Sequence, residues 1–181
     1  MSTPSSVTEH TLEVVRGNKP QNMACLEKHA KLSNNVTVSP VHPGRVVHLN
    51  NSLEFELGVT GIKMPIFLVN GSLSADVDAM VDPLVGTAAV NPDGTLTGLV
   101  ATGGFEFEST EFDTDRTYTV NQPLRAVASN SNATSGGRLT NESVTLYTNT
   151  ICGIVSAPKR QNHHKRWVLR FWSVFLPGAA A

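Results

Sequence analysis

The sequence predicts an all-β fold, either a small β-barrel or a jelly-roll-like sandwich, with an extended N-terminal arm. Short apolar runs recur at close spacing, and turn-forming Gly, Pro and Asn residues separate them, as is typical of sandwiches and small barrels. Residues 99–123 show the clearest alternation, with Phe105 and Phe107 on one side and Glu106 and Glu108 on the other. This alternation indicates a strand with one buried face and one face in water.

The size and composition of the chain set the domain organisation. The 181 residues are enough for one β-rich body with an arm, and we expect residues 1–40 to form the arm and residues 41–181 the body. Charged residues make up 16% of the chain, below the roughly 25% of an average soluble domain. The surface is therefore rich in small polar residues, or a partner covers much of it. The net charge of −1 argues against direct binding to nucleic acid.

The arm contains two segments with different predicted structures. Residues 12–17 (LEVVRG) suit an extended segment that pairs with another surface better than they suit a core strand. Residues 18–32 are predicted to hold a short helix, because Asn22 is a suitable N-cap and Glu27 precedes Lys31 by four positions.

The body is predicted to begin with a short strand at residues 36–38. Residues 64–69 (MPIFLV) are almost entirely apolar, which indicates a strand that is covered on both faces. Residues 72–91 are expected to form a loop over the mouth of the barrel. At Glu111 and Phe112 the alternation slips by one residue, which predicts a bulge or a change of sheet. The other predicted strands are residues 45–49, 53–57, 95–107, 117–120, 124–127, 138–140, 144–147, 151–155 and 167–176.

The last predicted strand, residues 167–176, contains both tryptophans of the chain. Neither of its faces is clearly polar, so we expect one side in the core and the other in an interface. Residues 76–115 carry nine acidic residues and no Lys or Arg, whereas residues 159–181 carry five basic residues and no acidic one. These segments form either two solvated faces or a contact in which an acidic face meets the exposed basic loop 159–166.

The chain offers few candidates for catalysis or metal binding. Ser156 and Lys159 match the S-x-x-K pattern, but Pro158 prevents the regular helix that this motif needs. Residues 111–115 contain three acids that could surround Ca²⁺, but they lack the EF-hand pattern, and a solvated acidic turn is the favoured interpretation.

The remaining metal-binding residue types are also poorly placed. His163 and His164 are neighbours, so on a strand they point to opposite faces, and a third ligand is not apparent. Cys25 and Cys152 fit no metal spacing, and two buried free thiols are favoured over a disulfide. We therefore expect no cofactor, no metal and no catalytic residues. The polar N-terminus and the lack of a bilayer-length apolar run predict that the protein has no membrane partner.

Three runs of the sequence resemble one class of viral proteins. They are residues 44–49 together with residues 55–58, residues 99–126, and residues 151–155 together with residues 169–178. The most telling features are a Tyr-x-x-Asn-Gln-Pro-Leu run, a Gly-Gly loop and an Ile-Cys-Gly-Ile-Val strand. Together they resemble the decoration, or cement, proteins that bind the outside of tailed-bacteriophage capsids.

The resemblance implies a structural virion protein without enzyme activity. It also implies a location on the outer capsid surface, after assembly in the host cytoplasm, and as partners the major capsid protein and other copies of the same chain in a homotrimer. The residues expected at interfaces are Leu12, Val14, Val15 and Arg16 in the arm and Trp167, Phe171 and Trp172 in the last strand. For two of the three aromatic residues, burial in the core is an equally strong alternative.

Three other functions fit the same β pattern. One is a carbohydrate-binding β-sandwich, which needs exposed aromatic rings beside Asp or Asn in a groove. Another is a hydrolase whose carboxylates come together only in space, with raised pKa values. A third is a different virion component, such as a tail or fibre protein.

Overall fold

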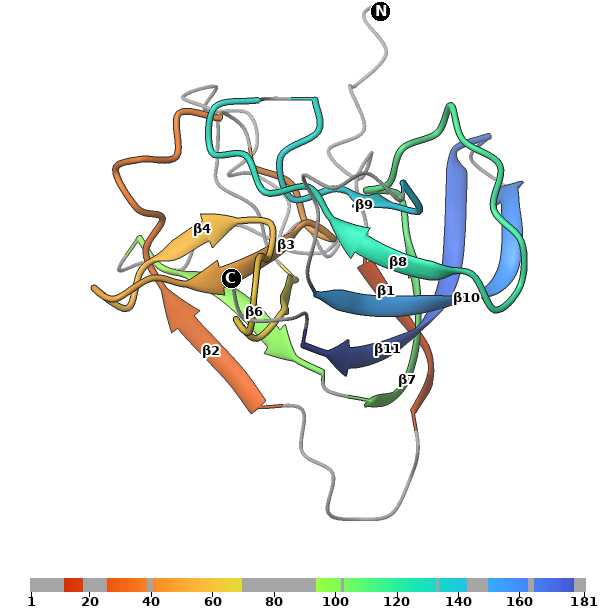
Figure 1. The fold of residues 1–181 in the computed structure, drawn as a ribbon, viewed down its shortest axis with the longest axis horizontal. Helices are drawn as coiled ribbons and strands as arrows, with labels where there is room; N and C mark the ends of the chain where they lie inside the picture. Colours follow the sequence, from red (N-terminus) through yellow and green to blue (C-terminus); the bar gives the residue numbers. More distant parts are fainter. Residues whose placement is uncertain are drawn as a thin grey trace, which may run out of the picture.

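A computed structural model describes the fold in eight segments of the chain. These are residues 12–17, 26–38, 41–69, 94–101, 103–132, 134–142, 150–162 and 165–177. Within them the protein is all-β and consists of two antiparallel sheets (Figure 1), which confirms the predicted fold class.

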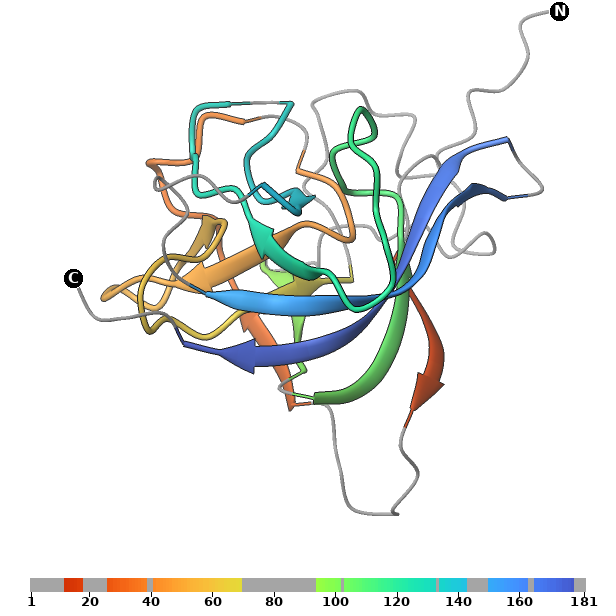
Figure 2. The ribbon, with the colours of Figure 1, turned by 45° about the vertical axis from the view of Figure 1, so that its right-hand side comes forward.

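The larger sheet has six strands, and the smaller sheet has five. The strands of the larger sheet are β1 (Leu12–Gly17), β7 (Gly103–Ser109), β8 (Pro123–Ala126), β9 (Leu139–Thr140), β10 (Ile151–Gln161) and β11 (Trp167–Leu176), in the order β1-β7-β11-β10-β8-β9. The strands of the smaller sheet are β2 (Leu26–Ala30), β3 (Val46–Leu49), β4 (Phe55–Leu57), β5 (Ile66–Leu68) and β6 (Leu96–Val100), in the order β2-β6-β5-β3-β4. In Figure 2, β10 and β11 run side by side along the body, and their hairpin end extends beyond the rest of the sheet.

The main core lies between the two sheets and is built around three phenylalanine rings. Phe107 from β7 and Phe171 from β11 lie 5.8 Å apart between ring centroids, and Phe67 from β5 lies 5.2 Å and 5.7 Å from them. All three side chains are fully buried. Such large rings remove much apolar surface from water and hold the two sheets together.

A second apolar cluster lies on the other side of the smaller sheet. Ile66 and Leu68 belong to this cluster, whereas Phe67 between them belongs to the main core. Val38 and Val41, which precede β3, cover this side. The prediction that the apolar strand is covered on both faces is therefore confirmed.

The predicted helix in the arm is wrong. Leu26–Ala30 forms strand β2, which pairs antiparallel with β6 from Leu26↔Val100 to Ala30↔Leu96. The apolar stripe of the expected helix was thin, and pairing with β6 gives this segment backbone hydrogen bonds and buries Ala30. The expected cap, Asn22, lies outside the described residues.

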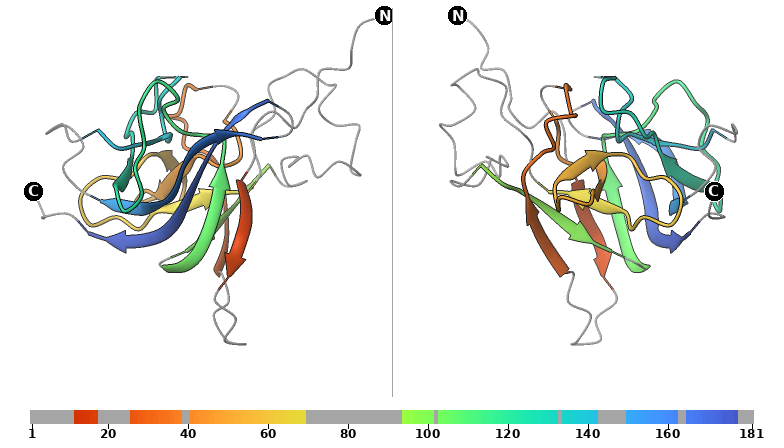
Figure 3. Two further views of the ribbon diagram at one scale, coloured as in Figure 1. Left: turned by 90° about the vertical axis from the view of Figure 1, so that its right-hand side faces the viewer. Right: turned by 60° about the vertical axis from the view of Figure 1, so that its left-hand side comes forward.

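Strand β1 is an edge strand of the chain's own larger sheet. It pairs antiparallel with β7, with Leu12 opposite Ser109 and Val14 opposite Phe107. The side chains of Leu12 and Val15 are half-buried, whereas those of Val14 and Arg16 lie outside the described part. The smaller sheet draws on residues from both sides of position 40, because it contains β2 as well as β3 (Figure 3).

The phase slip predicted at Glu111 and Phe112 marks the point where the chain leaves β7. The strand ends at Ser109, whose Oγ accepts a hydrogen bond from the Glu111 N–H at 3.0 Å. Phe112 then forms an isolated bridge with Leu139, and the side chains of both Glu111 and Phe112 are fully buried.

Other predicted elements differ in detail from the structure. Residues 36–38 and 117–120 are not strands, and the first three residues of the predicted basic loop, 159–161, belong to β10. Residues 72–91 and 144–147 lie outside the described residues. None of the described residues belongs to a helix with the length and hydropathy that a membrane crossing requires.

Candidate functional site

The outward side of the larger sheet carries a set of polar and aromatic side chains that we call the outer face. On β11, Arg170 pairs in register with Glu108 of β7, and Trp172 pairs with Glu106 of β7 and Ile154 of β10. Because strand side chains alternate, Arg170 and Trp172 share a face opposite to Phe171. The outer face consists of Glu106, Glu108, Ile154, Ser156, Arg160, Arg170 and Trp172.

The two glutamates of the outer face are buried, so the prediction that their side of the strand faces water is wrong. Their exposed fractions are 6% for Glu106 and 7% for Glu108. Glu108 Oε2 accepts hydrogen bonds from Nη2 of Arg160 at 2.7 Å and Nη2 of Arg170 at 3.0 Å. Glu106 Oε1 accepts one from Ser156 Oγ at 2.6 Å. The acidic strand thus meets basic residues of the same chain.

The three aromatic residues expected at an interface have different surroundings. Phe171 is fully buried in the core, the alternative that the sequence left open. Trp172 is 37% exposed on the outer face, and Trp167 is 42% exposed at the start of β11. A contact of either tryptophan with another subunit stays a prediction.

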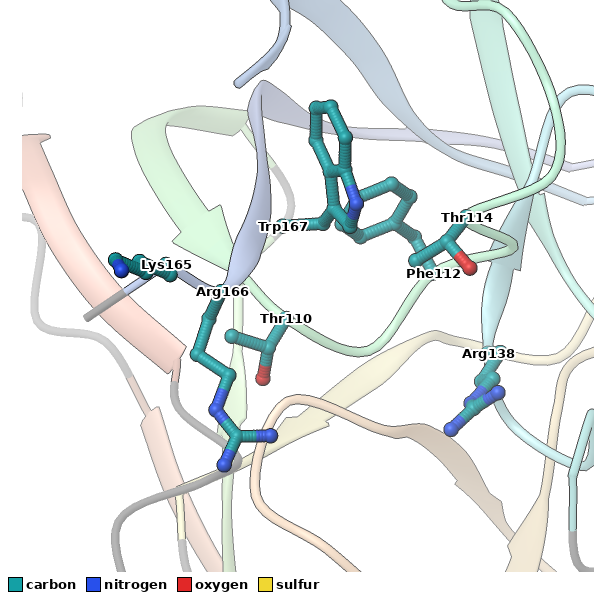
Figure 4. Close-up of a pocket in the computed structure, with 7 residues that line it drawn as sticks. All are labelled: Thr110, Phe112, Thr114, Arg138, Lys165, Arg166 and Trp167. Atoms are coloured by element: carbon teal, nitrogen blue, oxygen red, sulfur yellow. The ribbon is translucent and has the colours of Figure 1, made fainter. Parts of the chain in front are cut away.

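A second candidate site, which we call the basic pocket, lies beside the start of β11 (Figure 4). Its volume is about 300 Å³, and it lies where the segment after β7, the residue before β9 and the turn before β11 come together. The lining residues are Thr110, Phe112, Thr114, Arg138, Lys165, Arg166 and Trp167.

Asn162 fixes the turn that brings two cations and the tryptophan to this pocket. Its backbone carbonyl accepts a hydrogen bond from Lys165 N–H at 2.9 Å, and its Oδ1 accepts one from Arg166 N–H at 3.0 Å. Lys165 has a φ of 59°, in the left-handed region that side-chain-bearing residues seldom adopt. The turn therefore places Lys165, Arg166 and Trp167 in defined positions.

A buried ion cluster supports the inner wall of the pocket. Glu111 Oε2 accepts hydrogen bonds from Arg45 Nε at 2.9 Å and from Arg138 Nε at 3.4 Å, and Arg45 Nη1 donates to Gly136 O at 2.8 Å. Burial lowers the pKa of Arg45, and the charge of Glu111 partly opposes this effect. Within the cluster one carboxylate faces two guanidinium groups, so positive charge remains on the side of Arg138 that borders the pocket.

The rim of the pocket is held by a cation–π contact. Lys159 Nζ lies 5.3 Å from the centroid of the Trp167 ring and also donates a hydrogen bond to Thr114 O. These contacts tie β10, β11 and the segment after β7 to one another at the rim.

The acidic turn considered for Ca²⁺ has cationic partners instead. Glu111 binds the two arginines described above, and Asp113 Oδ2 accepts a hydrogen bond from Arg116 Nε at 2.8 Å. In the segments that the structure describes, no three His, Cys, Asp or Glu side chains gather as a metal site requires. His163 and His164 lie outside those segments.

Cys152 is a free, fully buried cysteine, as the sequence predicts. Burial raises the pKa of its thiol to about 12. The thiol therefore stays protonated at neutral pH and is a poor nucleophile. Cys25 lies outside the described residues.

Sequence reasoning identified only Trp167 among the lining residues as a site residue. The rest come from three separate segments, and no local motif connects them. The only sequence signal was the basic character of residues 159–166, which lie next to the pocket.

Comparison with known proteins adds no relative: no family model, no curated protein and no solved structure matches the chain.

Proposed function

We propose that the protein is a structural virion protein that binds the outer surface of a bacteriophage capsid and stabilises it by bridging capsomers. The observation that carries the proposal is Trp172, a large ring that is 37% exposed in the middle of the ion-paired outer face. The resemblance of three sequence runs to capsid decoration proteins supports the choice of partner.

The outer face has the properties of a protein-binding surface. Tryptophan and arginine are the residues most often found at the energetic centres of protein interfaces. Arg170 is already held by Glu108, so this side chain loses little conformational freedom when a partner binds. Trp172 then serves as the apolar anchor, and the surrounding charges set the orientation of the partner.

Strand β1 offers a second point of attachment. It is the terminal strand of the larger sheet, so one of its edges faces away from β7. A strand of the capsid or of another copy can add to such an edge through main-chain hydrogen bonds. Leu12, Val14, Val15 and Arg16 would then lie at this contact. Two weak contacts per chain, repeated in a homotrimer, give the avidity that capsomer bridging needs.

The test is co-sedimentation of the protein with capsid shells in their expanded and unexpanded forms. The variant Trp172→Ala should lose at least about tenfold in affinity, because interface anchors contribute about 2 kcal/mol or more. The matched control is Ile62→Ala, which removes a side chain that is 67% exposed outside the outer face. Equal loss of binding in both variants, or none in Trp172→Ala, would refute the role of the outer face.

One observation favours carbohydrate binding as a second candidate function. Trp167 is exposed at the rim of the basic pocket, and sugar rings commonly stack on such side chains. The polar residues of the pocket are cations and threonines, not the Asp or Asn expected for a neutral sugar. A glycan array that includes acidic glycans separates this function from capsid binding.

A further inference from the structure

We infer that a proton on His48 controls residues 60–64, which belong to the loop between β4 and β5. The neutral imidazole of His48 holds Lys63, and with it the loop. The protonated imidazole releases Lys63 and binds Glu56 instead. This exchange of partners concerns the conformation of the chain itself, so it does not depend on capsid binding.

The first basis is the hydrogen bonding of the neutral ring. His48 lies on β3 and is 4% exposed, and its Nδ1 lies 2.7 Å from the carbonyl oxygen of Gly58. A carbonyl oxygen only accepts, so Nδ1 carries a hydrogen. Nε2 lies 2.9 Å from Lys63 Nζ, and an ammonium group only donates, so Nε2 accepts through its lone pair. The contact with Lys63 therefore exists only while Nε2 carries no proton.

The second basis is an acidic partner that already lies beside Nε2. Glu56 pairs with His48 across the two strands, and Glu56 Oε2 lies 3.6 Å from His48 Nε2. The other carboxylate oxygen, Oε1, accepts hydrogen bonds from the side-chain amides of Asn35 at 3.2 Å and Asn50 at 3.4 Å. The bond from Asn35 is the main cause that lowers the pKa of Glu56, so this carboxylate stays charged in mildly acidic solution.

A proton on Nε2 changes that atom from an acceptor into a donor. It then faces the ammonium group of Lys63 with like charge and without a hydrogen bond to share. Lys63 is exposed, so its ammonium group can turn to water. A shift of less than about 1 Å brings Glu56 Oε2 within hydrogen-bond distance of Nε2, and this bond joins opposite charges. The bond from Nδ1 to Gly58 is the same in both states, so only the partner of Nε2 changes.

The charges around His48 come from two elements. They are Lys63 of the loop and Glu56 of β4, and these are the charged groups that act on the ring. Glu54, the other acid of this hairpin, accepts a hydrogen bond from Asn50 at 3.3 Å. Strand β5, which also pairs with β3, contains no titratable residue. Lys63 and Glu56 are therefore the residues whose replacement should change the titration of His48.

The surroundings of His48 also set the pH range of the exchange. Burial lowers the pKa of the ring most, and Lys63 lowers it further, whereas the bond to Gly58 and the charge of Glu56 oppose this effect. The ring therefore takes up its proton below the ordinary value of 6.5. We expect the release of Lys63 in mildly acidic solution and the held loop at neutral pH.

The loop has little apolar contact to keep it in place once Lys63 is released. The side chains of Ile62 and Met64 are 67% and 44% exposed, so they bury little surface. A further hydrogen bond, from Thr150 Oγ1 to Gly61 O at 2.5 Å, ties the loop to the residue before β10. Segments with few buried contacts open at a low cost in free energy, so loss of the Lys63 contact should reduce the order of residues 60–64.

The test is NMR of the full chain from about pH 7.5 down to about pH 5, the range in which histidines titrate. The chain has six histidines, so the variant His48→Gln assigns the imidazole signal of His48. Backbone order parameters of residues 61–63 should fall from about 0.85 toward about 0.6 as the pH decreases. The midpoint of this fall should coincide with the titration midpoint of His48.

Three variants test the two partners of the ring. Lys63→Met removes the cation that disfavours the proton, so the midpoint of His48 should move to higher pH, and the loop should have low order at neutral pH as well. Glu56→Gln removes the acid that favours the proton, so the midpoint should move to lower pH. The matched control is Glu54→Gln, which removes a neighbouring acid that binds Asn50 and should leave the midpoint unchanged.

Three results would overturn the inference. One is an order of residues 61–63 that stays constant while His48 titrates. Another is an equal shift of the midpoint in Glu56→Gln and Glu54→Gln, because this would show a general effect of negative charge. The third is loss of the core signal of Phe107 together with the loop signals, because this would show unfolding of the whole chain. Co-sedimentation with capsid shells at neutral pH is a separate measurement, so failure of one proposal is distinguishable from failure of the other.

Discussion

Two ion clusters of this protein have the same composition and different surroundings. Each contains one glutamate and two arginines: Glu111 with Arg45 and Arg138, and Glu108 with Arg160 and Arg170. The side chains of Glu111 and Arg45 are 0% and 1% exposed, whereas Arg160 and Arg170 are 50% and 28% exposed. The Glu111–Arg45 pair of the first cluster belongs to the core, while its Arg138 is 30% exposed. Both arginines of the second cluster reach the surface at the outer face.

This difference shows that one glutamate and two arginines can stabilise the fold in one place and form part of a surface in another. In the core, neither charge of the pair can return to water, so the loss of one partner strands the other. On the outer face Glu108 is buried, but both of its arginine partners reach water, so solvent and salt screen their charges and their net contribution to stability is small. The outer face can therefore vary with the needs of a partner, while the buried cluster is fixed by folding.

The largest effect is expected for Glu111→Gln. This change leaves Arg45 buried without its carboxylate, and we expect the free energy of unfolding to fall by about 3–5 kcal/mol. Urea denaturation followed by circular dichroism measures the change. The double variant Arg45→Met with Glu111→Leu removes both charges and should recover part of the loss. A loss below about 1 kcal/mol in Glu111→Gln would contradict the claim that Arg45 becomes an uncompensated buried charge when its carboxylate is removed.

His48 is a second buried side chain that can carry a positive charge, and its protonation makes the stability of the fold depend on pH. The carbonyl oxygen of Gly58 accepts a hydrogen bond from His48 Nδ1 at 2.7 Å, so Nε2 accepts the one from Lys63 Nζ at 2.9 Å. This arrangement requires the neutral ring. Burial lowers the pKa of His48 from its ordinary value of 6.5. The hydrogen bond to Gly58 and the charge of Glu56 oppose this effect, whereas Lys63 adds to it.

The sign of the pH dependence follows from this lowered pKa. As pH falls below 6.5, the unfolded chain takes up the proton before the folded protein does, so stability decreases with decreasing pH. Above 6.5 the contribution of His48 is fully present. Urea midpoints measured from about pH 7.5 down to about pH 5.5 should show this slope. His48→Gln should flatten it, whereas His29→Gln, which changes an exposed histidine, should not.

A smaller effect is expected for Glu108→Gln. Arg160 and Arg170 remain in contact with water after the change, so the free energy of unfolding should fall by about 1 kcal/mol or less. About 1 M NaCl should remove most of the difference from the unchanged protein, because salt screens exposed charges. A loss as large as that of Glu111→Gln would contradict the distinction between the two clusters.

The smallest effect on stability is expected for Lys165→Asn. Lys165 is exposed, and asparagine adopts its left-handed backbone conformation more readily than lysine does. The free energy of unfolding should change by less than about 0.5 kcal/mol, as measured by the same urea titration. A larger loss would show that the lysine side chain supports the turn and does not serve only the pocket.

The sequence predicts best the elements that local patterns define. The last strand was predicted at residues 167–176, which are the bounds of β11, and the apolar run at residues 64–69 contains β5. The phase slip at Glu111 marks the end of β7 because a one-residue change in alternation reverses the side-chain directions. These signals need no knowledge of distant residues.

The wrong predictions depend on contacts between distant parts of the chain. The sequence pattern predicts that Glu106 and Glu108 face water. Their actual partners, Ser156, Arg160 and Arg170, lie about 50 to 62 residues later and cannot be recognised from the local pattern. The segment 26–30 is a strand because β6, from far along the sequence, supplies its hydrogen bonds. The basic pocket was missed for the same reason, since three separate segments form it.

The most direct test of the proposed function is a density map of expanded capsid shells decorated with this protein. The account predicts that the outer face, with Trp172 at its centre, lies against the shell or against a neighbouring copy bound to it. A map in which Trp172 faces solvent on every bound copy would contradict the account.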